Sequence, residues 1–138
     1  MGFLAGKRAL ILGIPSNRSI AWGIPQAMRH EGAELALTYQ TDKLKPRVEK
    51  MAAELDSSIA LPCEVENDAD IDALFEQLKT HWEGLDILVH SIAYAPREAL
   101  EGDYLEGISR ENFRIAHDIS SYSFAALAKA ARKFSRLM

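Results

Sequence analysis

Short apolar runs occur along the chain at intervals that leave room for one helix between them. They lie at Arg8–Leu12, Glu34–Thr38, Ile59–Val65 and Asp86–Ser91. Runs of this length, which are apolar at successive positions, are typical of strands covered on both faces. The pattern therefore predicts four buried strands.

The segments between these runs repeat apolar residues at helical spacing. The clearest series comprises Leu44, Val48, Met51, Ala52 and Leu55. Such a stripe indicates an amphipathic helix with one buried face. Similar spacing predicts a helix from about Ile20 to Met28, another that ends near Trp82 with Asp68 or Asp70 as its N-cap, and a long Ala- and Ser-rich helix from Asn112 to about Arg136.

The order of these elements alternates strand and helix from one end to the other. Strands joined by single helices run parallel, with right-handed crossovers. We therefore predict an α/β fold over residues 1–138, a partial Rossmann-type, doubly wound parallel sheet with helices in two outer layers. Ligands bind such a sheet at the carboxyl ends of its strands, which draws attention to the loops after Leu12, Thr38, Cys63 and Ser91.

Composition narrows the class of protein. The 138 residues carry 16 Lys and Arg against 20 Asp and Glu, a net charge of −4, which argues against a nucleic-acid partner. The 48% hydrophobic content is that of a globular domain. No apolar run reaches the length of a membrane span and no signal peptide is evident, so a cytoplasmic location is the default expectation. A single cysteine, Cys63, excludes an internal disulfide and a cysteine-based metal cluster, and no other metal-ligand spacing occurs.

The loop after the first run has features of a phosphate-binding turn. Gly13 permits a sharp turn, and Ser19 is a plausible N-cap for the helix that follows. The start of that helix offers N–H groups and a partial positive charge to a pyrophosphate. The segment lacks the G-x-G-x-x-G fingerprint, however, so on these residues alone an ordinary strand–helix turn is an equal alternative.

Several stretches together carry a family resemblance. They are Met1–Lys7, the Gly13-x5-Ser-Ile-Ala-x-Gly motif that ends at Gly23, Glu31–Ala36, Thr38–Gln40, His90–Pro96 and Ala116–Ser123. In these stretches the chain resembles the NADH-dependent enoyl-acyl-carrier-protein reductases of bacterial fatty-acid synthesis, which are divergent short-chain dehydrogenases/reductases. The resemblance extends to about Arg132 and covers the N-terminal half of such an enzyme.

The resemblance implies a role for particular positions. It implies that NADH is held at its pyrophosphate by Gly13, Ser19 and Ile20, on its adenosine side by Gln40, at the adenine by Glu64 and Val65, and at the nicotinamide-side ribose by Ile92, while the backbone of Ala95 lines the acyl-substrate pocket. The family usually has Asp where Glu64 stands. The added methylene could shift the adenine contact.

The residues alone leave the choice between NADH and NADPH open. Gln40, rather than a carboxylate, follows the second strand. Lys43, Lys45 and Arg47 could attract a 2′-phosphate, although a solvated helix face is the better interpretation of these three. The resemblance favours NADH.

The resemblance also implies an activity, the reduction of trans-2-enoyl thioesters on acyl carrier protein to acyl thioesters during fatty-acid elongation. In the family a tyrosine stabilises the enolate and a lysine holds the nicotinamide ribose, at Tyr-x6-Lys spacing after a fifth strand. We expect this chain to end before any fifth strand, so that both residues would lie beyond residue 138 and the truncated chain alone would be inactive. The alternatives are a non-catalytic nucleotide-binding fragment and a pseudogene product with an uncovered sheet edge beside the fourth strand.

Other candidate residues have simpler interpretations. Tyr122 and Lys129 have the catalytic spacing, but we expect a packed helix tyrosine and an exposed lysine. His90 has no evident serine or acid partner, and His117 and Asp118 are not expected to face one partner together. The family resemblance implies a homotetramer. Small residues of the last helix would permit close approach of a neighbouring subunit, namely Ala116, Ser120, Ala126, Ala130 and Ala131.

Overall fold

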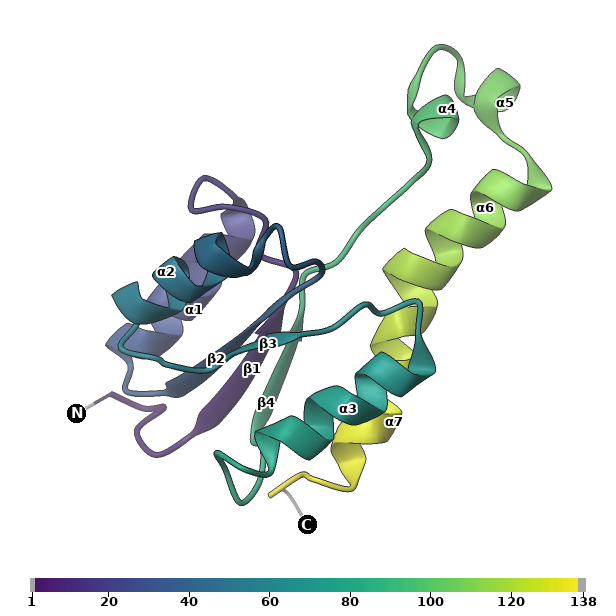
Figure 1. The fold of residues 1–138 in the computed structure, drawn as a ribbon. Coiled ribbons are helices and arrows are strands. Elements are labelled where there is room, and N and C mark those ends of the chain that lie inside the picture. The colour runs from purple at the N-terminus through teal and green to yellow at the C-terminus, as the bar shows by residue number, and fades with distance from the viewer. Residues whose placement is uncertain (1, 137–138) are drawn as a thin grey trace.

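The computed structural model describes residues 2–136, which are built around a four-stranded parallel sheet (Figure 1). Its strands are β1 (Arg8–Leu12), β2 (Glu34–Tyr39), β3 (Ala60–Pro62) and β4 (Ile87–His90). Their order across the sheet is β3-β2-β1-β4, and every neighbouring pair is parallel. This confirms the predicted Rossmann-type sheet.

Helices cover both faces of the sheet, and the alternation of side chains along β1 shows how. Ala9 and Ile11 belong to a core cluster with residues of α1 (Ile20–His30) and α2 (Lys45–Glu54). Leu10 and Leu12 point to the opposite face and join a cluster with residues of α3 (Asp68–Leu78) and α7 (Ser123–Arg132). Successive residues of a strand face opposite sides of a sheet, so one apolar run fills both cores. The doubly wound arrangement follows directly.

The third strand and third helix have different limits from those predicted. Strand β3 is shorter than the predicted run Ile59–Val65, because the chain turns away after Cys63, with the N–H of Asn67 bonded to the Glu64 carbonyl at 3.0 Å. The N-cap of α3 is Asn67, whose Oδ1 accepts from the N–H of Ala69 at 2.9 Å, rather than Asp68 or Asp70. The helix ends before Trp82, which is nevertheless buried.

The long C-terminal helix is continuous but changes its winding. It comprises α6 (Arg110–His117), a π-helical turn η1 (Asp118–Tyr122) and α7, so it ends four residues before the predicted Arg136. Beyond it, the N–H of Leu85 donates to the Phe134 carbonyl and the N–H of Arg136 donates to the Leu85 carbonyl, both at 2.9 Å. These bonds form a parallel bridge between Leu85 and Ser135. This bridge is isolated and lies outside the four named strands of the described residues.

Residues 97–117 form an arm that leads away from the sheet (Figure 1). The arm contains α4 (Arg97–Leu100), α5 (Tyr104–Gly107) and α6, and none of these helices has a buried residue. It leaves large apolar side chains exposed, including Leu100, Tyr104, Leu105, Ile108 and Phe113.

Three of the small residues of the last helix pack within the chain. Ala126 and Ala130 pack against the core cluster shared with α3, and Ala131 is buried within it. The close approach they permit is thus between two helices of the same chain. Ser120 is also engaged within the chain, as described below. The exposed large side chains here are instead Tyr122 and Phe124.

Candidate nucleotide-binding site

The loops after β1 and β4 meet closely at the carboxyl edge of the sheet. Gly13 has a φ of +92°, and a Cβ atom at this position would overlap the carbonyl of Ser91 and the side chain of Ile92. The N–H of Ser91 donates to the Leu12 carbonyl at 2.9 Å, which continues the β1–β4 pairing up to this point. Only glycine fits both the backbone angle and the space. Two predicted site residues, Gly13 and Ile92, are thereby brought into contact range.

The first turn of α1 points its N–H groups toward the same edge. Ser19 occupies the N-cap position, as predicted, but its hydroxyl donates to the Ser16 carbonyl at 2.8 Å instead of capping the helix. The first turn contains no acidic residue. The positive end of the helix dipole is therefore not neutralised there, which suits an anion such as a pyrophosphate. Ile20 is 95% exposed at this turn and is available to a ligand.

The adenosine side of the predicted site is assembled by a hydrogen bond between two loops. The Nε2 of Gln40, just past β2, donates to Oε2 of Glu64, just past β3, at 2.8 Å. The backbone N–H of Glu64 donates to Asp70 Oδ2 at 3.1 Å, which ties the loop to the start of α3. Val65 is half-buried against the core. The structure therefore brings together predicted residues that lie 24 positions apart in the chain.

One further contact supports the site, and it was not predicted. Arg47 of α2 donates from Nη1 to the Pro15 carbonyl at 3.2 Å, so it braces the loop after β1. Lys45, which could also have faced a phosphate, lies 3.8 Å from Glu49 on its own helix. The sequence feature that could have indicated Arg47 is a basic residue in the first turn of the helix after β2.

The segment after β4 carries Ile92 and Ala95 and is tied to η1. The N–H of Tyr94 donates to Ser120 Oγ at 2.9 Å, and the Ser120 hydroxyl donates to the Tyr94 carbonyl at 3.0 Å. Ile92 and Ala95 are both half-buried. Sequence reasoning missed Ser120, because its role depends on how the helix packs beside β4.

His90 has a serine partner, but not in an arrangement that would make the imidazole a base. Its Nε2 lies 2.8 Å from Ser123 Oγ, and the Ser123 hydroxyl donates to the Ile119 carbonyl at 2.6 Å. Because the Ser123 hydroxyl donates its hydrogen bond to the Ile119 carbonyl, its oxygen accepts a hydrogen bond from the Nε2–H of His90. Burial lowers the pKa of His90, which favours this neutral form. The pair joins β4 to the helix and has no acid to make it a catalytic base.

Cys63 lies next to the adenosine side but is not a reactive thiol. It is buried, and burial, with the charges of Asp70 and Glu64, raises its pKa to about 12. A thiol with so high a pKa is a poor nucleophile at neutral pH. The prediction of a small buried residue is confirmed.

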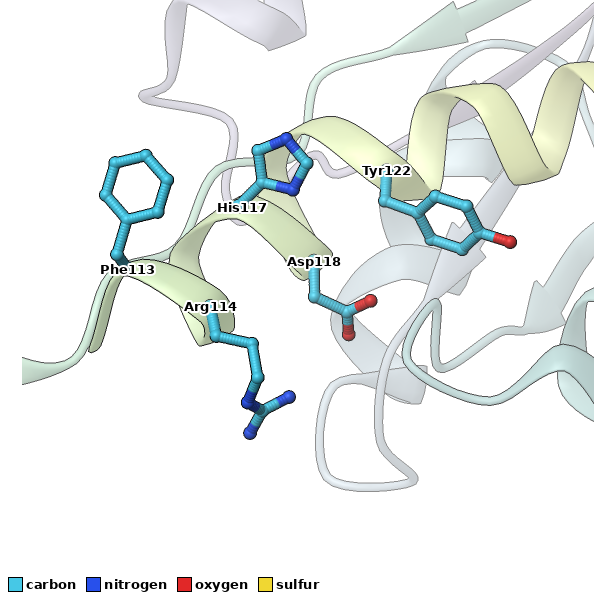
Figure 2. Close-up of a pocket in the computed structure, with 5 residues that line it drawn as sticks. All are labelled: Phe113, Arg114, His117, Asp118 and Tyr122. Carbon is cyan, nitrogen blue, oxygen red and sulfur yellow. The ribbon is translucent and has the colours of Figure 1, made fainter. Parts of the chain in front are cut away.

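The other cavities lie away from this edge. Figure 2 shows a shallow depression of about 450 Å³, lined by Phe113, Arg114, His117, Asp118 and Tyr122. His117 and Asp118 both border this depression, but their side chains point in different directions (Figure 2). Tyr122 and Lys129 line a groove between α3 and α7, and Tyr122 is 52% exposed rather than packed. None of the predicted nucleotide-binding residues lines either cavity.

Metal-binding clusters and membrane-spanning helices are both absent from residues 2–136. In this part of the chain, no group of three or more His, Cys, Asp or Glu side chains is placed to hold a metal ion. None of the helices described above combines the length and apolar character needed to cross a membrane.

Comparison with known proteins identifies relatives of the chain. A family model described as enoyl-(acyl carrier protein) reductase matches residues 13–138. The enoyl-[acyl-carrier-protein] reductase [NADH] FabI of Salmonella typhimurium is 61% identical over 132 residues, which is 96% of this chain and 50% of the relative. The corresponding protein of Neisseria meningitidis is 60% identical over 136 residues, covering 99% of this chain and 52% of the relative. The chain thus spans about half the length of the curated relatives it matches.

Solved structures give the same result. The NADH enoyl-[acyl-carrier-protein] reductase of Aquifex aeolicus superposes with a TM-score of 0.93 at 47% identity, over 97% of this chain and 53% of that one. The enoyl-(acyl-carrier-protein) reductase of Anaplasma phagocytophilum, solved in complex with NAD, has a TM-score of 0.91 at 36% identity, over 97% and 51% of the two chains.

Proposed function

Because this chain belongs to the enoyl-(acyl carrier protein) reductase family, we propose that it binds NADH at the carboxyl edge of its sheet, as the nucleotide-binding part of an NADH-dependent enoyl reductase. The observation that carries the proposal is the convergence of four separate loops at one edge. Gly13 meets Ser91 there, and Gln40 is bonded to Glu64. A Cβ at Gly13 would overlap Ser91 and Ile92, so glycine at this position lets the loops after β1 and β4 lie close together beside the start of α1.

Each of the predicted residues has a physical role in this proposal. Gly13, Ser19 and Ile20 surround the start of α1, where free N–H groups attract the pyrophosphate. Gln40, Glu64 and Val65 would hold the adenosine, and Ile92 the ribose next to the nicotinamide. The backbone of Ala95 would line the acyl pocket. NADH supplies a hydride when bound, and this chain's residues orient the dinucleotide along the edge.

Charge at the adenosine end supports NADH over NADPH. The carboxylate of Glu64 lies beside Gln40, where an added 2′-phosphate would meet a like charge. Arg47 and Lys45 are engaged with Pro15 and Glu49. Two like charges at about 4 Å repel by roughly 1 kcal/mol even in water. We expect the affinity for NADPH to be lower than that for NADH by about fivefold or more.

We propose that the 138-residue chain holds NADH without turning over an enoyl thioester. The implied tyrosine and lysine must meet the nicotinamide, whereas Tyr122 and Lys129 line a groove between two outer helices. In the proposed whole enzyme the catalytic pair lies beyond residue 138, the substrate is a trans-2-enoyl group on acyl carrier protein, and the setting is cytoplasmic fatty-acid elongation. The proposed whole enzyme is a homotetramer, to which the exposed side chains of Tyr122 and Phe124 on the last helix are available.

Calorimetric titration of the purified chain with NADH and NADPH tests this function. The proposal predicts saturable NADH binding, weaker NADPH binding, and a lower NADH affinity in the Gln40→Ala variant. NADH absorbance in the presence of a trans-2-enoyl thioester should stay constant. Absence of NADH binding by a folded chain would refute the binding function, and steady NADH oxidation would refute the absence of turnover.

A further inference from the structure

We infer that Ser120 is a positioning residue that holds residues 92–96 in place above the carboxyl end of β4. The ligands of this segment rest on the proposed function, in which Ile92 contacts the dinucleotide and Ala95 contacts the acyl group. The position of the segment is inferred from the hydrogen bonds of Ser120, and these can be tested separately.

Ser120 satisfies both backbone groups of one residue. Its Oγ accepts from the Tyr94 N–H at 2.9 Å and donates to the Tyr94 carbonyl at 3.0 Å. Within the described chain, residues 92–95 make no other backbone hydrogen bond and belong to no helix or strand. An extended segment without a partner strand is restrained by its side-chain packing, here at Ile92, and by hydrogen bonds such as these. The Ser120 hydroxyl is therefore the fixed point of this segment.

The π-helical turn places two serines on one side of the helix. Ser120 and Ser123 are three residues apart, so their side chains point in similar directions. Ser123 is bonded to His90 and Ser120 to Tyr94. The helix thus holds the chain at two points four residues apart, with Ile92 midway between them. π-Helical turns are frequent at functional sites, and this one sets the spacing of the two anchors.

The contact is not a large contribution to global stability. Tyr94 is half-exposed and is not part of either core cluster, although Ile92 packs against one of them, so removal of the Ser120 hydroxyl should act locally. A single neutral hydrogen bond of this kind corresponds to a change in affinity of about three- to tenfold. We therefore expect NADH to bind about three- to tenfold more weakly to the Ser120→Ala variant, with little change in the unfolding midpoint.

Two substitutions provide matched comparisons. Ser121→Ala removes the neighbouring hydroxyl, which is exposed, while the Tyr94 backbone is bonded to Ser120, so the substitution should leave the segment as it is. Ser120→Thr keeps a hydroxyl at the anchor and should restore the wild-type behaviour. Circular dichroism of each full-length variant checks that it is folded.

The direct test is the rate of amide hydrogen exchange at Tyr94, measured by NMR in the 138-residue chain. We expect exchange at Tyr94 to become about tenfold faster in Ser120→Ala, with Ser121→Ala and Ser120→Thr unchanged. Unchanged exchange in a folded Ser120→Ala chain would overturn the inference, as would equal NADH affinity in Ser120→Ala and wild type. If the wild-type chain binds no NADH, the proposed function fails, and the exchange at Tyr94 still decides whether Ser120 holds the segment.

Discussion

From Ala9 to Leu12 every side chain is fully buried, whereas no residue in the three helices of the arm is buried. The sheet half derives its shape from packing on both faces. The arm relies on local contacts, such as the 2.6 Å bond from Arg97 to Glu101 and the Asp103 cap on Leu105. Local contacts at the surface stabilise far less than buried apolar area does. The geometry of the nucleotide site therefore depends on the sheet half, and the arm contributes little to it.

Matched leucine substitutions give the largest expected difference between the two regions. Leu10 is fully buried in β1, and Leu105 is 76% exposed in the arm. Leu10→Ala should lower the free energy of unfolding by about 2–5 kcal/mol through lost burial and a cavity. Leu105→Ala should change it by no more than about 0.5 kcal/mol. Urea denaturation measures both free energies of unfolding. Similar losses at the two positions would contradict the contrast between the packed sheet half and the exposed arm.

Alanine substitutions at two glycines with positive φ separate the cost of backbone strain from the cost of close packing. Gly13, at φ +92°, faces Ser91 and Ile92, whereas Gly102 in the arm, at φ +70°, has open space where a Cβ atom would stand, with nothing within 4 Å. Gly102→Ala should cost about 1 kcal/mol from strain alone. Gly13→Ala should cost about 1–3 kcal/mol, because the edge must also open.

The same pair separates effects on binding. Gly13→Ala should weaken NADH binding at least about tenfold, since displacement of the loop removes the anion-binding geometry. Gly102→Ala should bind NADH as the wild type does. Calorimetry on both variants decides the point, and equal affinities would remove Gly13 from the proposed site.

A smaller, pH-dependent effect is expected at His90, which joins the sheet to the last helix. Burial lowers its pKa in the folded chain below the ordinary value near 6.5. The unfolded chain therefore takes up a proton more readily, so the stability that His90 contributes is full above about pH 6.5 and declines as the pH falls below it. Unfolding free energies at about pH 7.5 and 5.5 measure this decline.

Two variants assign that decline to the right residue. His90→Gln should flatten it, because the unfolded chain no longer gains a proton at this position. His30→Gln, at an imidazole whose side chain is 85% exposed, should retain it. If wild type and His90→Gln decline equally, His90 is not the group responsible.

The predictable and unpredictable parts of the fold differ in their physical origin. The strands and α1–α3 follow from apolar spacing, since burial of a periodic face determines them. The Asn67 cap competes with Asp68 and Asp70, and only the local backbone decides among the three. The isolated bridge between Leu85 and Ser135 joins residues far apart in the chain, which the apolar pattern of one helix cannot reveal.

The site divides in the same way. Gly13 and Ser19 are identifiable because a strand–turn–helix signal is local. The bond between Gln40 and Glu64, and the anchors at Ser120 and Ser123, join residues far apart in sequence through irregular segments. A π-helical turn has no characteristic spacing of apolar residues from which it could be predicted. The serines on its inner side therefore look like small packing residues until the fold is known.

The most direct test of the account is an NMR titration of the 138-residue chain with NADH, in which the backbone amides are followed individually. The account predicts saturable shifts at Gly13, Ser19, Gln40, Val65 and Ile92, with residues 97–117 unmoved. Shifts confined to the arm, or no shifts in a folded chain at millimolar NADH, would contradict it.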